Sequence, residues 1–226
     1  MQHRLPLVFV AGMVLLAFGF AGVVVWYVVA APTGASTIGF VQPTAGAAPR
    51  EGRAPTASGS GSNRTVSQVW VDRVAAKAGI PATAVLAYGR AQLDAPCAIG
   101  WTTLAGIGWV ESQHGTIGGR TLLASGYSSS PITGPALTGG LDRAYGPMQF
   151  IPATWSRYAT DGDGDGASDP NDIFDAAVAT ADYLCADGYD LATSSGWAQA
   201  IFSYNHSQDY VNQVYAAAVA YDQRTR

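Results

Sequence analysis

The sequence predicts an all-α fold for residues 66–226. Apolar residues in this region recur at helical spacing, and no segment sustains the alternation of apolar and polar residues that is typical of a β-strand. The preceding part of the chain differs in composition, so the 226 residues are expected to form one domain with an appendage. We divide the appendage into an N-terminal transmembrane helix over residues 1–31 and a disordered linker over residues 32–65.

The transmembrane helix is predicted by a run of 27 uncharged residues from Leu5 to Ala31, because about 20 apolar residues in a helix cross the hydrocarbon core of a membrane. Arg4 precedes this run and no Lys or Arg follows until Arg50, so the positive-inside bias places the N-terminus in the cytoplasm. We therefore expect a single-pass anchor in the plasma membrane, with the domain outside. The alternative is a cleaved signal peptide, in which case the domain would be secreted.

Residues 32–65 are dominated by Pro, Gly, Ala, Ser and Thr and contain almost no large apolar side chains. Such a composition cannot bury enough apolar surface to offset the entropy of folding, so we expect a flexible tether. A flexible chain of 34 residues would reach on the order of 30 Å.

Seven helices are expected in the domain, because apolar residues recur every three or four positions and Pro, Gly and Thr mark several ends. They are expected to begin after Thr65, at Pro81, near Ile99, at Pro152, near Phe174, near Trp197 and at Ser207. Between the third and fourth helices, the segment from Thr116 to Ala144 is rich in Gly, Ser, Thr and Pro. It is too long for a simple connection and is typical of a lid or cleft wall.

Cys97 and Cys185 both lie in the domain that is expected outside the membrane. An oxidising compartment favours a disulfide between them, and two free buried thiols are the alternative. A disulfide that closes a loop of 88 residues would restrict the unfolded chain. The lost entropy corresponds to a stabilisation of the folded state by about 4–5 kcal/mol.

The balance of charge argues against a nucleic-acid partner. The net charge is −4, and the stretch from Asp161 to Asp190 contains nine Asp and no Lys or Arg. A surface that binds nucleic acid needs clustered cations against the phosphates. We therefore expect no nucleic-acid binding, and the sequence indicates no particular protein partner.

The segment DGDGDGASDPND, residues 161–172, has the spacing of an EF-hand calcium loop. Alternate side chains of such a curled loop converge on a hard cation that takes six to eight oxygens, and a glycine at the sixth position permits the sharp turn. The expected ligands are the carboxylates of Asp161, Asp163 and Asp165, the residue Ala167 at the seventh position, and a final acid. Asp172 would close a loop of twelve residues and Asp175 one of fifteen, and the spacing leaves both open.

Because the acidic loop occurs once, the expected role of calcium is structural. Regulatory EF-hands usually come in pairs. The alternatives are a calcium sensor and a solvated acidic turn, in which the carboxylates would repel one another without a cation.

Glu111 is the only glutamate of the domain, since the second Glu of the chain lies in the linker. It follows Leu104, Ile107 and Gly108 by seven, four and three residues, so it shares the apolar face of its helix. Burial and the negative end of the helix dipole both disfavour a carboxylate there. The pKa of Glu111 is therefore expected to be raised, which makes this residue a candidate general acid.

No second acid has an obvious claim as the partner of Glu111, because the other acids lie in the acidic loop or are scattered. Ordinary glycosidases pair two carboxylates. A mechanism with one carboxyl would need help from the substrate. A glutamate that is paired with Arg120 or Arg143 would instead be structural.

Four segments occur in the order LAGIGWVESQHG, YGPMQFIPATW, the acidic loop followed by DAAVATADYL, and YNHSQDYVNQV. Together they resemble the lytic murein transglycosylases of the membrane-bound B type, in an actinobacterial-style version. The resemblance covers roughly residues 66–221, and Glu111 lies in the first segment. It implies a lysozyme-like α-helical domain that acts on the glycan strands of peptidoglycan.

The resemblance implies cleavage of the β-1,4 bond between N-acetylmuramic acid and N-acetylglucosamine without addition of water, which leaves a 1,6-anhydromuramic end. Glu111 would protonate the glycosidic oxygen, the muramic N-acetyl group would stabilise the cationic centre, and Glu111 would then act as base on the 6-hydroxyl. The alternatives are a hydrolytic muramidase and a non-catalytic protein that binds or organises the cell wall.

The resemblance also implies a set of substrate-binding residues. Gln149 and Phe150 match the wall of the family's cleft, and Tyr183 matches an aromatic residue that faces the catalytic acid. The polar groups of the YN motif would hold the glutamate and the N-acetyl group. The set comprises Gln149, Phe150, Tyr183, Tyr204, Asn205 and Tyr210. For each aromatic residue the alternative is packing in the core.

The family's calcium loop is of the longer kind, which favours Asp175 over Asp172 as the final ligand. The two cysteines are not a general family feature, and their positions suggest a bridge from the region before Glu111 to the helix after the acidic loop. His114 and His206 lie in the motifs but lack the spacing of metal ligands, so we expect them at the surface or beside the site residues.

Overall fold

The computed structural model describes residues 65–137 and 142–226. The transmembrane helix predicted over residues 1–31 and the linker up to residue 64 lie outside the described residues. In the part of the chain that is described, no helix is long and apolar enough to cross a membrane. The anchor and the cleaved signal therefore both stay predictions.

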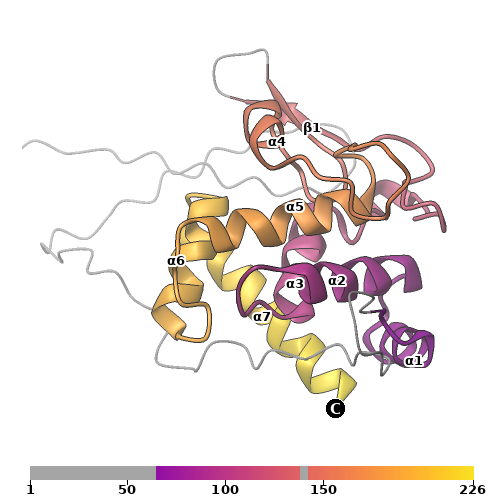
Figure 1. Cartoon of the computed structure of the whole chain (residues 1–226), viewed down its shortest axis with the longest axis horizontal. Helices are drawn as coiled ribbons and strands as arrows, with labels where there is room; N and C mark the ends of the chain where they lie inside the picture. The colour runs from indigo at the N-terminus through magenta and orange to yellow at the C-terminus, as the bar shows by residue number, and fades with distance from the viewer. Residues whose placement is uncertain (1–64, 138–141) are drawn as a thin grey trace, which may run out of the picture. The chain divides into compact units, whose positions relative to one another are not determined.

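Seven α-helices make up most of the described domain (Figure 1). Each begins within about three residues of its expected start; Pro81, for example, precedes its helix instead of opening it. The helices are α1 (Gln68–Ala78), α2 (Ala82–Asp94), α3 (Trp101–Ser112), α4 (Pro152–Tyr158), α5 (Ile173–Ala186), α6 (Ser194–Tyr204) and α7 (Gln208–Thr225).

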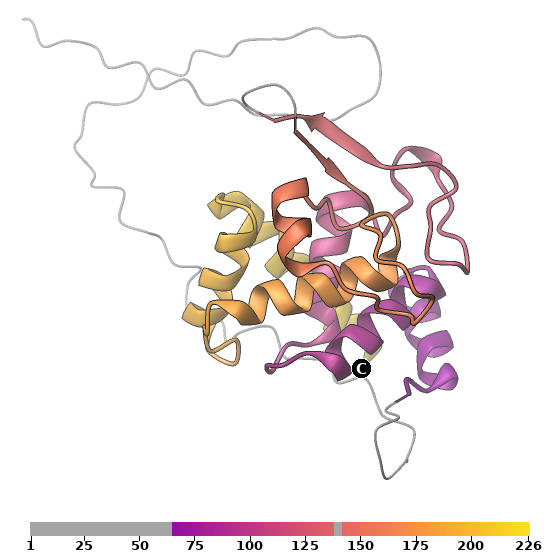
Figure 2. The ribbon, with the colours of Figure 1, turned by 45° about the horizontal axis from the view of Figure 1, so that its top comes forward.

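The prediction of a purely helical fold is wrong in the segment between α3 and α4. This segment contains a 3₁₀ turn, η1 (Ile117–Gly119), and an antiparallel hairpin of β1 (Thr133–Ala136) and β2 (Arg143–Tyr145). Figure 2 shows the hairpin above the helices. Strands of four and three residues are too short to display a recognisable alternation of apolar and polar residues, so periodicity did not predict them.

Helix α3 lies at the centre of the described domain. Every residue from Trp101 to Gly108 is buried, because α2, α5 and α7 all pack against this helix (Figure 2). Gly106 allows the close approach of α7, since an added Cβ would lie 2.8 Å from the backbone oxygen of Val214. A helix that is apolar on all sides is typical of such a buried position.

The predicted disulfide between Cys97 and Cys185 is present. The two Sγ atoms are 2.04 Å apart and the two Cα atoms 5.7 Å apart. Cys97 precedes α3, and Cys185 lies at the end of α5. The bridge therefore ties the start of the central helix to the helix that follows the acidic loop, as expected.

Candidate active site at the end of helix α3

Glu111 lies in the last turn of α3 and is partly buried. Leu104, Ile107 and Gly108, which precede it on the same face, are fully buried, as the helical spacing predicted. Burial raises the pKa of Glu111 from 4.5 to about 7. A carboxyl with such a pKa can give up a proton and take one back near neutral pH, as an acid and base catalyst must.

Tyr210 holds this carboxyl. It lies in the first turn of α7, and its hydroxyl donates a hydrogen bond of 2.6 Å to Oε1 of Glu111. The bond partly offsets the effect of burial, because it lowers the pKa of Glu111. Burial and the nearby charge of Glu111 raise the pKa of Tyr210, so its hydroxyl keeps its proton and remains a donor.

The two arginines that could have made Glu111 structural contact backbone oxygens instead. Arg120 donates to Ile117, Ser130 and Pro131, and Arg143 donates to Gly134. Among the described residues, the salt bridge that forms is between Arg226 and Asp222, at the end of the chain. The partner of Glu111 is therefore a neutral hydroxyl, which leaves the pKa raised by burial.

Tyr204 extends the site from Tyr210 toward the MQF motif. The rings of Tyr204 and Tyr210 are stacked, with centroids 6.4 Å apart and planes 13° from parallel. The Tyr204 hydroxyl donates a bond of 2.7 Å to the backbone oxygen of Met148. The buried Phe150 ring packs against the Tyr204 ring in a T-shaped arrangement with centroids 6.1 Å apart. Three of the predicted substrate-binding residues thus form one aromatic cluster next to Glu111.

The other three predicted residues form no hydrogen bond with the Glu111 carboxyl in the described part of the chain. The rings of Tyr183 and Tyr204 pack in a T-shaped arrangement with centroids 5.3 Å apart, and the Tyr183 hydroxyl donates to the backbone oxygen of Ser203. Gln149 has a positive φ of 53° and donates to the backbone oxygen of Gly146. Asn205 is exposed at the C-terminal end of α6. Of these three, Tyr183 adjoins the aromatic cluster through its contact with Tyr204.

The site contains buried residues that the sequence did not reveal. His114 was expected at the surface or beside the site, and the structure buries it to 2% exposure. Its ring lies between the hydroxyls of Tyr88 and Tyr221. These two residues come from helices α2 and α7, at 26 and 107 positions from His114, so no local pattern links them. His206 is exposed, as expected.

The acidic loop joins α4 to α5 and brings three carboxylates together. One oxygen from each of Asp161, Asp163 and Asp175 lies within 4.8 Å of the others. The Asp175 carboxylate also accepts hydrogen bonds from the amides of Gly162 and Asp169 on the loop. A cluster of carboxylate oxygens on a curled loop suits a hard cation such as calcium.

Of the two candidates for the last ligand, the geometry favours Asp175. Asp172 is buried and caps the start of α5, where its side chain accepts from the Phe174 amide. The Asp165 side chain accepts from the amide of Ala167 and is not part of the cluster of three carboxylates. The Asp165 carboxylate is thus not gathered with the other three, and the role of Ala167 as a ligand stays a prediction.

Residues 125–201 match the family model described as the transglycosylase SLT domain. The matched segment includes Phe150, Tyr183 and the acidic loop, begins after Glu111 and ends before Tyr204. It supports the prediction that the chain is an enzyme of the lytic transglycosylase type. No curated protein matches the chain.

Two solved structures resemble this one at low sequence identity, and each match covers 70% of this chain. The first is the Escherichia coli lytic transglycosylase SLT35 in complex with bulgecin A, with a TM-score of 0.47, 15% identity and 79% of that chain covered. The second is SltB3 from Pseudomonas aeruginosa in complex with NAG-anhNAM-pentapeptide, with a TM-score of 0.47, 17% identity and 66% of that chain covered.

Proposed function

We propose that the chain is a peptidoglycan lytic transglycosylase of the membrane-bound B type. It cleaves the β-1,4 bond between N-acetylmuramic acid and N-acetylglucosamine and leaves a 1,6-anhydromuramic end. The observation that carries the proposal is the partly buried Glu111. Its carboxyl accepts a hydrogen bond of 2.6 Å from the Tyr210 hydroxyl, and burial raises its pKa to about 7. The match of residues 125–201 to the transglycosylase SLT domain supports it.

In the first step Glu111 acts as general acid. Its protonated carboxyl gives the proton to the glycosidic oxygen while the bond from that oxygen to muramic C1 breaks. The carbonyl oxygen of the substrate's N-acetyl group bonds to C1 and takes up the positive charge. Among the described residues, no other carboxylate contacts Glu111, and this step needs none.

In the second step Glu111 acts as general base. The carboxylate removes the proton of the 6-hydroxyl, the 6-oxygen bonds to C1, and the bond from C1 to the N-acetyl oxygen breaks. The anhydro ring closes and Glu111 is again protonated, so atoms and charges balance without water. A pKa near 7 suits both steps, because the same group must lose and regain one proton.

Tyr210 directs the chemistry to one oxygen of the carboxyl. Oε1 of Glu111 is occupied by the Tyr210 hydroxyl, which leaves Oε2 for the glycosidic oxygen. The hydrogen bond also stabilises the carboxylate that forms after the first step, since bonds to the charged form favour it. Tyr204 and Phe150 line the neighbouring aromatic surface, which suits the apolar face of a sugar ring.

The proposal places this chemistry outside the plasma membrane, with the segment over residues 1–31 as anchor and residues 32–65 as tether. The acidic loop would hold a structural calcium ion through Asp161, Asp163 and Asp175, which lie within reach of one cation. Such an ion would fix the start of α5, the helix that carries Tyr183 against Tyr204.

Digestion of purified sacculi tests the proposal. The wild-type chain, the Glu111→Gln variant and the Glu51→Gln variant are incubated with sacculi, and the soluble products are identified by mass spectrometry. Glu51→Gln is the matched control because it replaces the second glutamate of the chain. We expect anhydromuropeptides from the wild type and the control, and none from Glu111→Gln at unchanged circular dichroism.

Two outcomes would overturn the proposal in different directions. Hydrated reducing ends would make the protein a muramidase. Binding to sacculi without soluble products, for the wild type as well as for Glu111→Gln, would make it a cell-wall binding or scaffold protein.

A further inference from the structure

The ring of His114 links the end of α3, close to Glu111, with helices α2 and α7. His114 follows the end of α3, its Nδ1 lies 3.0 Å from the Tyr88 hydroxyl on α2, and its Nε2 lies 2.9 Å from the Tyr221 hydroxyl on α7. The ring is buried, with the Trp109 ring 5.8 Å away between centroids. No role in the proposed chemistry accounts for this arrangement.

The network is neutral, so its geometry is defined by hydrogen bonds. Burial lowers the pKa of His114 from 6.5 to about 3. A neutral imidazole has one nitrogen that donates and one that accepts, so one of Tyr88 and Tyr221 donates to the ring and the other accepts from it. Burial also raises the pKa of both tyrosines, which keeps their protons in place at neutral pH. All the polar atoms of the His114 ring are thereby satisfied.

The backbone of His114 holds the turn that carries Glu111. Its amide donates a bond of 2.8 Å to the backbone oxygen of Gly108, six residues earlier and within α3. Gln113 and His114 both have positive φ, at 53° and 61°, so the chain reverses directly after the helix. The residue next to Glu111, Ser112, donates to the backbone oxygen of Pro147 at 2.6 Å. The last turn of α3 is therefore held on both sides of the carboxyl.

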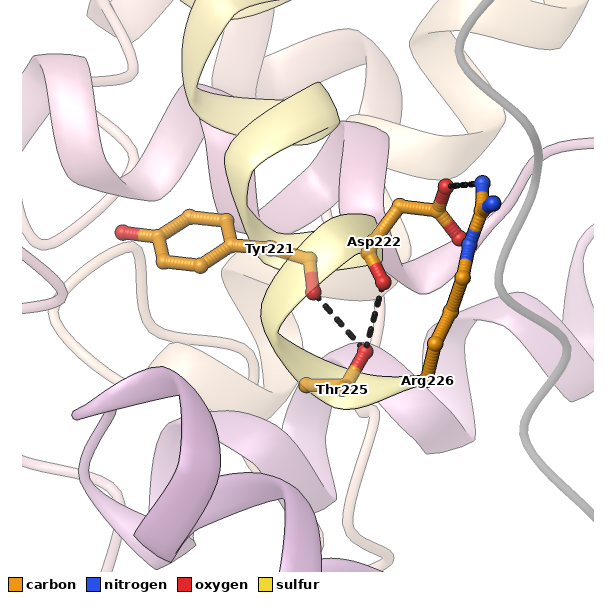
Figure 3. Close-up of polar contacts among 4 residues, drawn as sticks. All are labelled: Tyr221, Asp222, Thr225 and Arg226. Carbon is orange, nitrogen blue, oxygen red and sulfur yellow. Dashed lines mark hydrogen bonds and ion pairs between the residues drawn. The ribbon is translucent and has the colours of Figure 1, made fainter.

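The Tyr221 end of the network lies on the same helix as Tyr210. Figure 3 shows that the Tyr221 ring extends away from the last turn of α7, in which the Thr225 hydroxyl donates to the Tyr221 backbone oxygen and Arg226 pairs with Asp222. Helix α7 thus contacts α3 through Tyr210 with Glu111 and Val214 against Gly106, and it contacts the turn after α3 through Tyr221 with His114.

We propose that His114, held between Tyr88 and Tyr221, is a positioning residue that sets how closely Tyr210 approaches Glu111. The inference rests on the proposed function only for its effect on catalysis. The groups that face the Glu111 carboxyl are Tyr210 from α7 and Tyr204 from α6, through its charge interaction. Those that face His114 are Tyr88, Tyr221 and the Trp109 ring.

The chain offers a direct readout of this contact, because it contains two glutamates, Glu51 and Glu111. Carbon-13 labelling of the glutamate side-chain carboxyl therefore gives two NMR signals, and Glu51 is the internal reference. The titration midpoint of Glu111 reports on the Tyr210 hydrogen bond, since that bond lowers its pKa. The measurement uses the full-length chain in a mild detergent and needs no substrate.

The variants are Tyr210→Phe, Tyr221→Phe, Tyr88→Phe and the double variant Tyr210→Phe/Tyr221→Phe. Tyr215→Phe is the matched control, because Tyr215 is on α7 and packs on Trp197 away from the network. We expect Tyr210→Phe to raise the Glu111 midpoint by about one pKa unit and Tyr221→Phe by about half of that. Tyr88→Phe should act in the same direction as Tyr221→Phe, and Tyr215→Phe should have no effect.

The double variant shows whether Tyr221 affects the Glu111 midpoint through Tyr210 or through a general change in the stability of the fold. If Tyr221 acts through Tyr210, the double variant has the same midpoint as Tyr210→Phe. A midpoint unchanged by both Tyr221→Phe and Tyr88→Phe in folded protein, a midpoint unchanged by Tyr210→Phe, or additive shifts in the double variant would each overturn the inference.

Turnover on sacculi gives the second readout. Tyr221→Phe is expected to lower kcat about threefold with KM unchanged, because an altered acid affects the reaction more than substrate binding. A higher KM at an unchanged kcat would contradict this. If the wild type proves inactive on sacculi while the predicted midpoint shifts occur, the proposed function fails and the positioning role stands.

Discussion

At the scale of single residues, the protonation of Glu111 links catalysis to stability. Folding raises its pKa from 4.5 to about 7, so the folded chain binds this proton more tightly than the unfolded chain does. The contribution of Glu111 to the free energy of unfolding is therefore greatest below about pH 4.5 and is lost as the pH rises to about 7. At neutral pH and above, ionisation of the buried Glu111 carboxyl therefore lowers the stability of the folded chain. The proposed mechanism depends on the same raised pKa.

Glu111→Gln replaces the ionisable carboxyl with a neutral amide, which removes this pH-dependent loss of stability. Relative to the wild type, we expect the variant to gain free energy of unfolding as the pH rises from about 4 to about 8, on the order of 3 kcal/mol. Urea unfolding at a series of pH values measures the difference, with Glu51→Gln as control. A difference between Glu111→Gln and wild type that is the same at every pH would contradict the raised pKa.

Tyr210→Phe keeps the buried ring and removes its hydroxyl from Glu111. We expect kcat to fall about tenfold, because a hydrogen bond to a charged group contributes about 1.5–3 kcal/mol. The acid must be protonated, so activity declines above its pKa; the loss of the bond should move this alkaline limb upward. A pH profile of the turnover rate, with Tyr215→Phe as control, checks both effects, and a limb that moves downward would be inconsistent with the assigned donor.

At the scale of elements, periodicity predicted the helices well because it is a local property. All seven begin near their expected positions, and α3, which is apolar apart from its two threonines and the Glu111–Ser112 end, has the largest share of buried residues among them. The hairpin of β1 and β2 was not predicted, because its pairing depends on contacts such as Thr133 with Tyr145 across the intervening loop. Short strands in a segment rich in Gly and Pro carry no periodic signal of their own.

The disulfide should stabilise the domain chiefly by restricting the unfolded chain. Cys97 and Cys185 are 88 positions apart, so we expect the double variant Cys97→Ala/Cys185→Ala to lose about 4 kcal/mol in free energy of unfolding. Urea unfolding of both proteins under non-reducing conditions measures the loss. If the wild type unfolds at the same urea concentration with and without a reductant, the bridge contributes no stability.

The acidic loop should bind calcium through its carboxylates. We expect calcium in about hundredfold excess over its Kd to raise the melting temperature of the wild type by about 5 °C, through preferential binding to the folded state. Asp163→Asn, which removes one carboxylate of the cluster, should lose most of this shift. Asp187→Asn replaces an exposed acid outside the loop and should retain it. An equal shift in both variants, or none in the wild type, would remove the calcium site.

At the scale of the whole molecule, the candidate site could be predicted in part. Glu111 was predicted as the acid because it lies on the apolar face of its helix. Tyr204 and Tyr210 were predicted as site residues because their segment resembles the family's motif. Tyr183 was expected to face the acid; the fold packs its ring against that of Tyr204, and its role at Glu111 stays a prediction. A motif gives the order of residues along the chain and not their depth in the site.

The His114 network shows why the remainder could not be predicted. Its members come from α2, from the turn after α3 and from the end of α7, and they meet only when these helices pack. A histidine near a helix end, followed by glycine, is also typical of an exposed turn. Burial of His114 is thus a property of the assembled domain rather than of its segment.

The central claim is that Glu111 alone serves as acid and then as base, with no water consumed. Its most direct test is digestion of sacculi in heavy-oxygen water, followed by mass spectrometry of the muropeptides. We predict that the wild type releases products with anhydro ends and without the heavy isotope at muramic C1, and that Glu111→Gln releases none. Products that carry the heavy oxygen at C1 would show that water attacks the sugar and would contradict the account.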